Sequence, residues 1–450
     1  MPDSLLQMKS ARPWTSILSA GQQSAALFVA QDVVGRVTDH RILMETLAAA
    51  HHQTQYPDSI VWQPHGLASG NAGIAVVCSY VDQYLPNKGW DAVGHEFLVA
   101  STRAAQRSPQ LSSGLFAGLS GLAFAVHSLS RDGERYRRLL SALDQDLVPR
   151  TASIAAQLRR DATGMPVSAF DVVSGASGIA AYLLARDPYR LLPDLLTALV
   201  QLAAPTDGIP RWATPPEFLL NDPIRDSFPS GCLNCGLAHG IPGPLAVLSL
   251  ALRAGHEVPG QAEAISSLAG WLVAHQVHDA WGAAWPAALP LAPPTGPPLP
   301  VGGSRRARSA WCYGGPGVAR ALWLAGEALE DSGWRRLAVE AIASVLRSPV
   351  SQRHVDSSTF CHGVSGLLHI VLRFAHDTGD DVLVDGARTL VDQLLRAYEH
   401  DRPFGYADLE PGGNSVDRAD LLSGASGVAM VLHAAATGAE PVWDRMFLLS

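Results

Sequence analysis

Cysteine and charged residues are scarce in this sequence, and long apolar runs are missing. Five cysteines among 450 residues are too few for a disulfide framework, and in a cytosolic protein such thiols are more typical of metal binding or catalysis. The longest apolar runs, such as Pro244–Leu252, are far shorter than the roughly 20 residues that cross a bilayer. The N-terminus lacks the basic region and apolar core of a signal peptide. We therefore expect a cytoplasmic protein that does not span a membrane.

The charge balance argues against one class of partner. The chain has 33 lysines and arginines against 41 aspartates and glutamates, which gives a net charge of −8. A nucleic-acid-binding protein would need a basic surface, so nucleic acid is not the expected partner. Hydrophobic residues make up 47% of the chain and charged residues 16%, as in a well-buried globular protein. A chain of this length folds as two or three average domains or as one large closed architecture.

A repeated glycine pattern favours the closed architecture. A Gly-x-x-Gly followed by an apolar run recurs seven times, at intervals of 48 to 74 residues. Periods of this size are the signature of a repeat protein. The glycine pairs are Gly70/Gly73, Gly118/Gly121, Gly175/Gly178, Gly240/Gly243, Gly314/Gly317, Gly363/Gly366 and Gly424/Gly427.

Each unit predicts two helices of different character. The run Gly366–Phe374 is apolar on all sides, which is typical of a buried helix. The stretch Asp381–Tyr398 follows a polar turn and carries charges on one face. Because the inner helices are too apolar to face water, two concentric rings bury them best. We predict an all-α fold, an (α/α) toroid of about seven helical hairpins, in one domain spanning residues 1–450.

The alternative of an open α-solenoid is disfavoured because its terminal repeats would need a polar capping face. The last unit instead ends in the apolar run Met446-Phe-Leu-Leu449, as expected if it packs back on the first unit. Two stretches interrupt the pattern, near 204–236 and 280–310, and both are rich in proline and glycine. We predict loop insertions there. Each precedes a glycine turn that carries candidate chemistry, and long loops are often functional, so they are candidate walls of a substrate groove.

Two of the glycine turns carry soft metal ligands. Cys312 precedes the fifth turn, and Cys361 and His362 precede the sixth. Two thiols and an imidazole favour zinc over magnesium or calcium, and three protein ligands leave the open position that is typical of catalytic zinc. The two cysteines are 49 positions apart, so the fold must bring them together. We predict one Zn²⁺ per chain, bound by Cys312, Cys361 and His362.

Further reactive side chains lie beside other turns. His239 precedes the fourth turn, Asp171 the third, and Arg308 the fifth. If all seven turns emerge at one end of the toroid, these side chains meet although they are distant in the sequence. A histidine that titrates near neutral pH suits proton transfer, and an arginine suits an oxyanion.

Three motifs together resemble the lanthionine synthetase C-like cyclases. They read Gly236-Leu-Ala-His-Gly-Ile-Pro-Gly243, Trp311-Cys-Tyr-Gly-Gly-Pro-Gly317 and Cys361-His-Gly-Val-Ser-Gly366. The resemblance covers nearly the whole chain, and the three motifs together are highly specific. It implies an α/α toroid around one zinc that closes thioether rings. The reaction is the Michael addition of a peptide cysteine to dehydroalanine or dehydrobutyrine.

By position, the resemblance implies roles for the six residues already singled out. Zinc would be bound by Cys312, Cys361 and His362, His239 would be the acid/base group, and Asp171 and Arg308 would take part in the site. The substrate would be a dehydrated precursor peptide with a leader. The chain has no extra domain long enough to dehydrate serine or threonine, so a separate dehydratase is implied. An exporter, and a place at the periphery of a membrane-associated biosynthetic complex, stay open, as does a small strand-bearing insertion near 204–236.

Two other functions compete with this hypothesis. One is a non-catalytic, zinc-stabilised scaffold of the same fold that binds peptides or thiols. It would keep the three ligands without needing His239 and Arg308. The other is an α/α-toroid glycosidase or prenyl-transferring enzyme. Glycoside hydrolysis needs two facing carboxylates, and the turns supply only Asp171 and Asp420.

Several other reactive residues have plainer interpretations. The pair Cys232 and Cys235 has metal-like spacing, but no second pair accompanies it, and we interpret it as incidental. Cys78 lies in an apolar helix and is expected in the core. Three helix histidines have no evident partner in the sequence: His127, His369 and His376.

Overall fold

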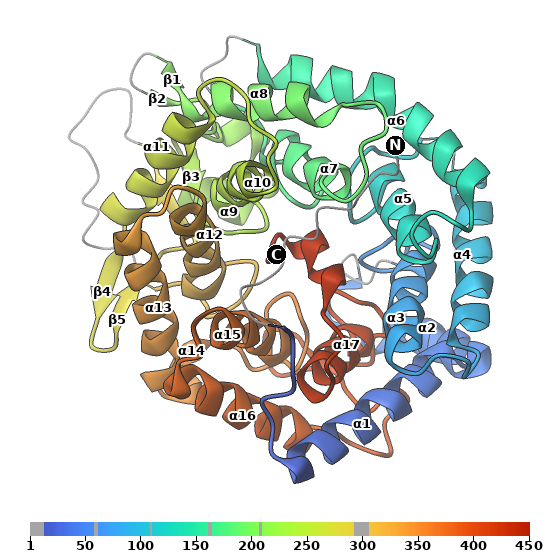
Figure 1. The fold of residues 1–450 in the computed structure, drawn as a ribbon. Helices are drawn as coiled ribbons and strands as arrows, with labels where there is room; N and C mark the ends of the chain where they lie inside the picture. Colours follow the sequence, from blue (N-terminus) through green and yellow to red (C-terminus); the bar gives the residue numbers. More distant parts are fainter. Residues whose placement is uncertain (1–12, 58–61, 109, 161–163, 207–208, 292–305) are drawn as a thin grey trace.

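Two concentric rings of helices form the molecule (Figure 1). The computed structural model describes residues 13–57, 62–108, 110–160, 164–206, 209–291 and 306–450. Within these residues, seven helices form the inner ring, and each contacts the next around a closed circle. They are α3 (Asn71–Tyr84), α5 (Leu119–Ser128), α7 (Ala176–Leu183), α10 (Pro242–Arg253), α12 (Gly315–Ala328), α15 (Val364–Thr378) and α17 (Ala425–Ala436).

An outer helix covers each inner helix. Six outer helices follow their inner partners in the sequence, as predicted, but α17 is covered by the N-terminal helix α1 (Ala20–Thr38). The expectation of one order in every unit is therefore wrong for the last unit, in which the two ends of the chain close the ring. Figure 1 shows the blue α1 beside the red α17. The other outer helices are α4 (Trp90–Arg107), α6 (Arg137–Leu158), α8 (Leu192–Ala203), α11 (Gln261–Ala274), α13 (Ser332–Arg347) and α16 (Asp381–Arg396).

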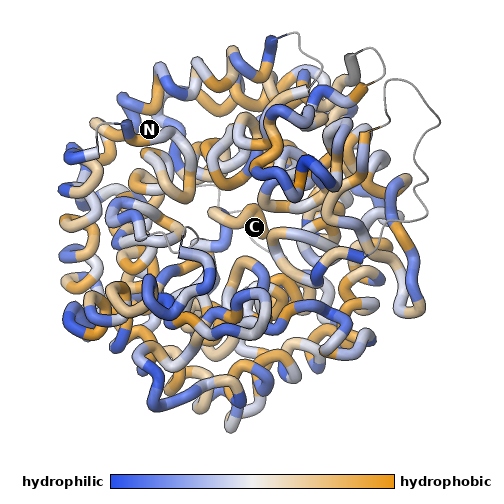
Figure 2. Tube along the Cα trace, turned by 180° about the vertical axis from the view of Figure 1, so that it is seen from behind, coloured by the Kyte–Doolittle hydropathy of each residue, from blue (hydrophilic) through white to orange (hydrophobic). Residues whose placement is uncertain are grey.

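The sixth hairpin shows why the two rings differ. In α15 every residue from Val364 to His376 is buried, so this helix has no solvent face. The helix ends at Gly379, which has φ +70°, a left-handed conformation that glycine adopts without strain. Asp380 then caps α16 by accepting from the amide of Val382 at 2.8 Å. The buried residues of α16 recur at helical spacing along one face, and the outer helices in Figure 2 accordingly alternate between hydrophobic and hydrophilic positions.

The second glycine of the repeat is needed for close packing. A β-carbon on Gly121 would overlap the carbonyl oxygen of Leu115, six residues earlier. Six of the seven turns have the same relation between their second glycine and the carbonyl six residues before it. The first turn of each inner helix thus lies directly on the backbone of the turn that leads into it.

Gly121→Ala should therefore destabilise the protein by about 1–3 kcal/mol, since the backbone must shift to admit the methyl group. A matched control is Gly35→Ala in α1, where an added β-carbon meets nothing within 4 Å. That change should stabilise the protein by about 0.5–1 kcal/mol, because alanine is the better helix former. Calorimetric unfolding of both variants is the measurement, and equal midpoints would contradict this account of the repeat.

A closed ring of backbone hydrogen bonds joins the seven turns. The amide of Cys312 donates to the carbonyl of Cys361 at 3.2 Å, and the amide of Cys361 donates to Leu422 at 2.8 Å. The circle closes where the amide of Leu421 donates to Ala68 at 3.0 Å. Each turn is thereby held beside the next at one end of the toroid. The remaining links, between 3.0 and 3.3 Å, join Ala68 to Phe116, Phe116 to Val173, Val172 to Ala238, and Ala238 to Cys312.

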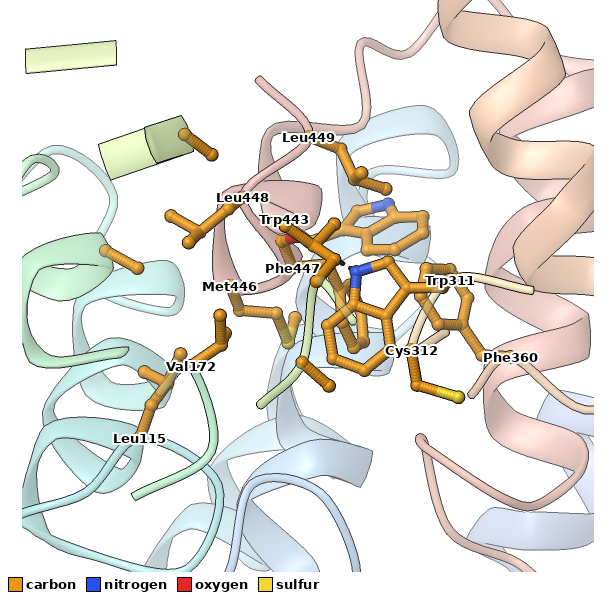
Figure 3. Close-up of a cluster of buried hydrophobic side chains, with 14 of the residues drawn as sticks. Leu115, Val172, Trp311, Cys312, Phe360, Trp443, Met446, Phe447, Leu448 and Leu449 are labelled. Atoms are coloured by element: carbon orange, nitrogen blue, oxygen red, sulfur yellow. Dashed lines mark hydrogen bonds between the residues drawn. The ribbon is translucent and has the colours of Figure 1, made fainter. Parts of the chain in front are cut away.

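The C-terminal segment fills the middle of the inner ring. The 3₁₀-helix η5 (Val442–Phe447) and the residues after it lie among side chains that the turns send inward (Figure 3). The Trp311 indole donates to the carbonyl of Phe447 at 3.0 Å, and the rings of Phe360 and Phe447 stack at 4.0 Å. The segment touches the first unit through Trp443, whose ring lies 6.0 Å from that of Tyr80. It also reaches the inner helices beyond the turns, where Arg320 of α12 donates to the Leu449 carbonyl at 2.7 Å. Its last apolar residues, Met446–Leu449, are buried away from water.

Two of the histidines without an evident partner have buried partners. His369 Nε2 lies 2.8 Å from Asp444, which also accepts from Arg373 at 2.5 Å. Although burial alone opposes ionisation, these two neighbours hold the pKa of Asp444 well below its usual value. His376 stacks on Trp14 at 3.8 Å and contacts the Thr15 carbonyl at 2.8 Å. These partners were not evident in the sequence because both come from the ends of the described chain, far from the histidines in sequence. Within the described residues, Nδ1 of His127 has no hydrogen-bond partner.

Short antiparallel strand pairs accompany the two rings of helices. The stretch predicted as an insertion near 204–236 holds strands, which confirms the strand-bearing extension, and one of them pairs with the second insertion. Residues 292–305 of that second insertion lie outside the described residues. None of the helices in the described ranges is both long and apolar enough to cross a bilayer. The strand pairs are β1 (Pro205–Thr206) with β2 (Ile209–Pro210), β3 (Cys232–Asn234) with β6 (Ala288–Pro290), β4 (Val277–Asp279) with β5 (Gly282–Ala284), and β7 (Asp408–Leu409) with β8 (Ser415–Val416). The remaining helical segments are α2 (His40–Gln53), η2 (Val167–Ala169), η3 (Pro216–Phe218), α9 (Asp222–Ser227) and α14 (Val350–Arg353).

Candidate functional site

The candidate residues occupy equivalent positions of neighbouring turns. Cys312 and Cys361 each lie two residues before the first glycine of their turn. His239, Tyr313 and His362 each lie one residue before it, on the fourth, fifth and sixth turns. Because the backbone ring joins these turns in order, side chains at one repeat position become neighbours in space. The fold thus brings the two cysteines together across 49 residues of sequence.

The two thiols influence each other's ionisation. The neighbouring Cys361 thiol lowers the pKa of Cys312 to about 7, with a further contribution from His362, Arg308 and His239. The Cys312 thiol, together with burial, raises the pKa of Cys361. Both cysteines also lie at the N-terminal ends of inner helices, where the helix dipole favours negative charge. One proton of the pair therefore leaves easily and the second is retained.

The third predicted ligand faces a carboxylate. Nε2 of His362 lies 3.4 Å from Oδ1 of Asp408, a residue of β7 that the sequence had not singled out. Although burial alone opposes it, the contacts with His362, Arg418 and Ser357 hold the pKa of Asp408 below its usual value. Within the described part of the chain, no three histidine, cysteine, aspartate or glutamate side chains already surround one point as a metal-binding group.

The donor set nevertheless fits zinc. Two interacting sulfurs, one of them acidic near neutral pH, are the soft anionic ligands that zinc selects over harder cations. His362 is the next residue along the chain from Cys361, and Asp408 engages only one of its ring nitrogens. The other nitrogen, Nδ1, is the one that a metal can use. Cys312, Cys361 and His362 would thus supply three ligands, and zinc bound in this way could take a fourth from a substrate.

Asp171 and His239 form a second, adjoining pair. Nδ1 of His239 lies 2.7 Å from Oδ2 of Asp171. The other oxygen of Asp171 accepts from the amides of Ser174 and Gly175, both at 2.8 Å. Because Nδ1 of His239 is engaged by the Asp171 carboxylate, Nε2 is the ring nitrogen left for proton exchange. The side chain of Asp171 is 2% exposed and that of His239 is 33% exposed, so the buried carboxylate fixes an accessible imidazole.

Arg308 and Tyr313 complete the surroundings of the thiols. Arg308 is exposed, and its charge lowers the pKa of both cysteines. The Tyr313 ring lies 6.3 Å from that of His239, its hydroxyl accepts from Asn234 at 3.2 Å, and burial raises its pKa to about 12. Tyr313 is not among the site residues predicted from the sequence, although it shares a repeat position with His239 and His362. That shared position is the signal that could have identified it.

Comparison with known proteins agrees with this geometry. The family model described as "Lanthionine synthetase C-like protein" matches residues 61–448, which is most of the chain. The chain belongs to the lanthionine synthetase C-like family. The nisin biosynthesis protein NisC of Lactococcus lactis subsp. lactis is 26% identical over 316 residues, which cover 66% of this chain and 71% of NisC. The solved structure of nisin cyclase superposes with a TM-score of 0.70 at 20% identity, covering 90% of this chain and 97% of that one.

The structural match confirms the fold of this lanthionine synthetase C-like protein. The predicted (α/α) toroid of helical hairpins is the architecture of nisin cyclase, and in this chain small strand pairs accompany it. Because the two chains are 20% identical, the superposition shows a shared fold and not a shared activity. The roles of the six predicted site residues stay predictions, which the geometry described above motivates.

The remaining cysteines of this lanthionine synthetase C-like protein lie in less reactive surroundings. Burial raises the pKa of Cys232 to about 11 and that of Cys235 to about 12. Cys232 belongs to β3, which pairs with β6, and the Cys235 thiol donates to the Leu233 carbonyl at 3.6 Å. Burial also raises the pKa of Cys78, in α3, to about 12. Their thiols therefore stay protonated near neutral pH, in contrast to Cys312.

Proposed function

We propose that this protein is a zinc-dependent lanthipeptide cyclase. It would form lanthionine and methyllanthionine bridges by adding cysteine thiols of a dehydrated precursor peptide to dehydroalanine or dehydrobutyrine. The observation that carries the proposal is that two interacting thiols, of which Cys312 is the acidic one, and a carboxylate-held histidine lie on consecutive turns of the backbone ring. Membership of the family and similarity to NisC support the same reaction class.

The Michael addition first requires a nucleophilic sulfur, which the predicted metal site would provide. A free thiol has a pKa of about 8.5, so only a few per cent is thiolate at pH 7. Zinc bound by Cys312, Cys361 and His362 would ionise a peptide thiol outright. The two protein thiolates would offset the charge of such an ion, so that a substrate sulfur would stay electron-rich and reactive. In the proposed reaction the carbon–sulfur bond forms at the β-carbon of the dehydro residue, and the π electrons move onto the α-carbon and its carbonyl oxygen.

The addition then requires a proton at the α-carbon, which His239 would deliver. Asp171 holds Nδ1–H and stabilises the imidazolium, so a proton on Nε2 can pass to the enolate. The histidine then recovers a proton from solvent or from the next peptide thiol. Arg308, exposed and always charged, would stabilise the enolate oxygen or orient the peptide. The peptide would approach from the turn side, because the C-terminal segment occupies the space between the inner helices beyond the turns.

The proposed partners follow from the reaction. Dehydration of serine and threonine must precede ring closure, so a separate dehydratase would supply the substrate and a leader peptide would deliver it. The strand-bearing insertions lie next to the fourth and fifth turns, where they would form walls of the substrate groove.

The test uses thiol labelling, since ring closure leaves the peptide mass unchanged. The protein is incubated with a panel of leader-bearing peptides that carry dehydroalanine or dehydrobutyrine and cysteine, the dehydrated nisin precursor among them. Free thiols are then alkylated and counted by mass spectrometry. We expect alkylation to fall by one adduct for each ring formed. Equal labelling of every peptide with and without the protein would contradict the proposed reaction.

A further inference from the structure

His362 has a neighbour that comes from outside the glycine turns. Asp408 lies in β7, 46 positions further along the chain, and its Oδ1 is 3.4 Å from Nε2 of His362. The segment around it reads Asp408-Leu-Glu-Pro-Gly-Gly413, with no metal-like spacing to any histidine or cysteine. The segment pairs with β8, and the contacts of Asp408 with His362 and Ser357 hold it beside the sixth turn.

Several contacts fix the Asp408 carboxylate in place. The Ser357 hydroxyl donates to Oδ1 at 2.9 Å, so the serine and His362 share one oxygen. The Arg418 guanidinium lies 3.9 Å from Oδ2 and donates to Asp420 at 2.9 Å. Asp408 itself is only 6% exposed. A buried carboxylate with a guanidinium and a hydroxyl beside it is ionised and has little freedom to move.

An ionised carboxylate beside an imidazole determines which ring nitrogen is protonated. Because Asp408 can only accept, it favours a proton on Nε2 of His362 and leaves the Nδ1 lone pair exposed. Histidines that bind metals usually donate their other N–H to such an oxygen, which orients the ring and raises its basicity. The Asn414 side chain and the Gln55 amide donate to the neighbouring Glu410. These bonds hold the β7–β8 hairpin without Asp408, so the Asp408 carboxylate is available to contact His362.

We propose that Asp408 is the positioning residue of the metal site. It holds Nε2 of His362 so that Nδ1 is the ligand nitrogen. The inference rests on the proposed zinc site, and it adds a carboxylate, with Ser357 and Arg418 behind it, to the three ligands. Asp408 touches neither substrate nor metal and acts only through His362.

The first test is zinc affinity of the full-length Asp408→Asn protein, measured by competition with a chromophoric chelator. Asparagine keeps the shape of the side chain and removes its charge. We expect zinc to bind about 10- to 100-fold more weakly than in the wild type. The matched control is Asp417→Asn, a buried carboxylate of the same region that pairs with Arg402 at 3.3 Å. Its affinity should stay within about threefold of the wild type.

A second measurement does not depend on the folding of a variant. Nitrogen-15 NMR of zinc-loaded wild-type protein should show His362 protonated on Nε2 and metal-bound on Nδ1. A metal-bound Nε2, or unchanged affinity of Asp408→Asn, would overturn the role of Asp408 while leaving the zinc site intact. A wild-type protein that binds no zinc would instead overturn the proposed function itself.

Discussion

Cys312→Ala should lower bound zinc from about one equivalent per chain towards none. The change removes the acidic thiol of the pair and leaves one sulfur and one imidazole, which are too few for a tight site. Ring closure should slow by more than about 30-fold, because the peptide thiol must then react with only a few per cent ionised. Elemental analysis of the purified variant and the thiol-labelling rate measure the two effects.

Cys78→Ala is the control for loss of a buried thiol. Cys78 is as buried as Cys312, but it lies within α3, and burial keeps its thiol protonated. This variant should retain the full zinc equivalent and the wild-type rate. A full equivalent of zinc in Cys312→Ala would show that the ligand set is wrong, and loss of zinc in both variants would point to a general effect on the fold.

His239→Ala should leave zinc in place and slow ring closure by about 10²- to 10⁴-fold, the usual contribution of a general acid or base. Proton delivery to the α-carbon would then come from solvent, so we also expect mixed stereochemistry in the rings that still form. Zinc content, initial rates and chiral analysis of the hydrolysed product check the three parts of this prediction. A non-catalytic scaffold of the same fold would show no such rate difference.

Because Asp171 contacts His239, a double variant can test whether the two residues act together. Asp171→Asn alone should lower the rate of ring closure. In the His239→Ala background the same change should lower that rate little further, because Asp171 acts through the imidazole. His278→Ala serves as the control, since His278 lies exposed in β4. Additive losses in the double variant would mean that Asp171 contributes independently of His239.

The toroid could be predicted because it is encoded locally and seven times over. Every Gly-x-x-Gly marks the start of an inner helix, and in six of the seven turns the carbonyl six residues earlier leaves no room for a β-carbon on the second glycine. What the repeats could not reveal is how the ring closes. The outer partner of α17 is α1, from the opposite end of the chain. The C-terminal segment lies inside the ring, against residues of several turns.

The candidate site was predictable where it follows the repeat and not elsewhere. Cys312 and Cys361 share one position of adjacent turns, and the backbone ring makes such positions neighbours. Asp408 belongs to a hairpin outside the repeat, so neither spacing nor motif indicates its contact with His362. Tyr313 had the positional signal, but an aromatic beside a cysteine is more often a packing residue.

Thiol labelling with zinc removed and restored tests the central claim most directly. The wild-type protein is stripped with a chelator and assayed with a dehydrated peptide that the untreated protein cyclises, before and after addition of one equivalent of Zn²⁺. The account predicts that the stripped protein leaves the peptide thiols free to alkylate and that zinc restores ring closure. Full cyclisation by the stripped, metal-free protein would contradict it.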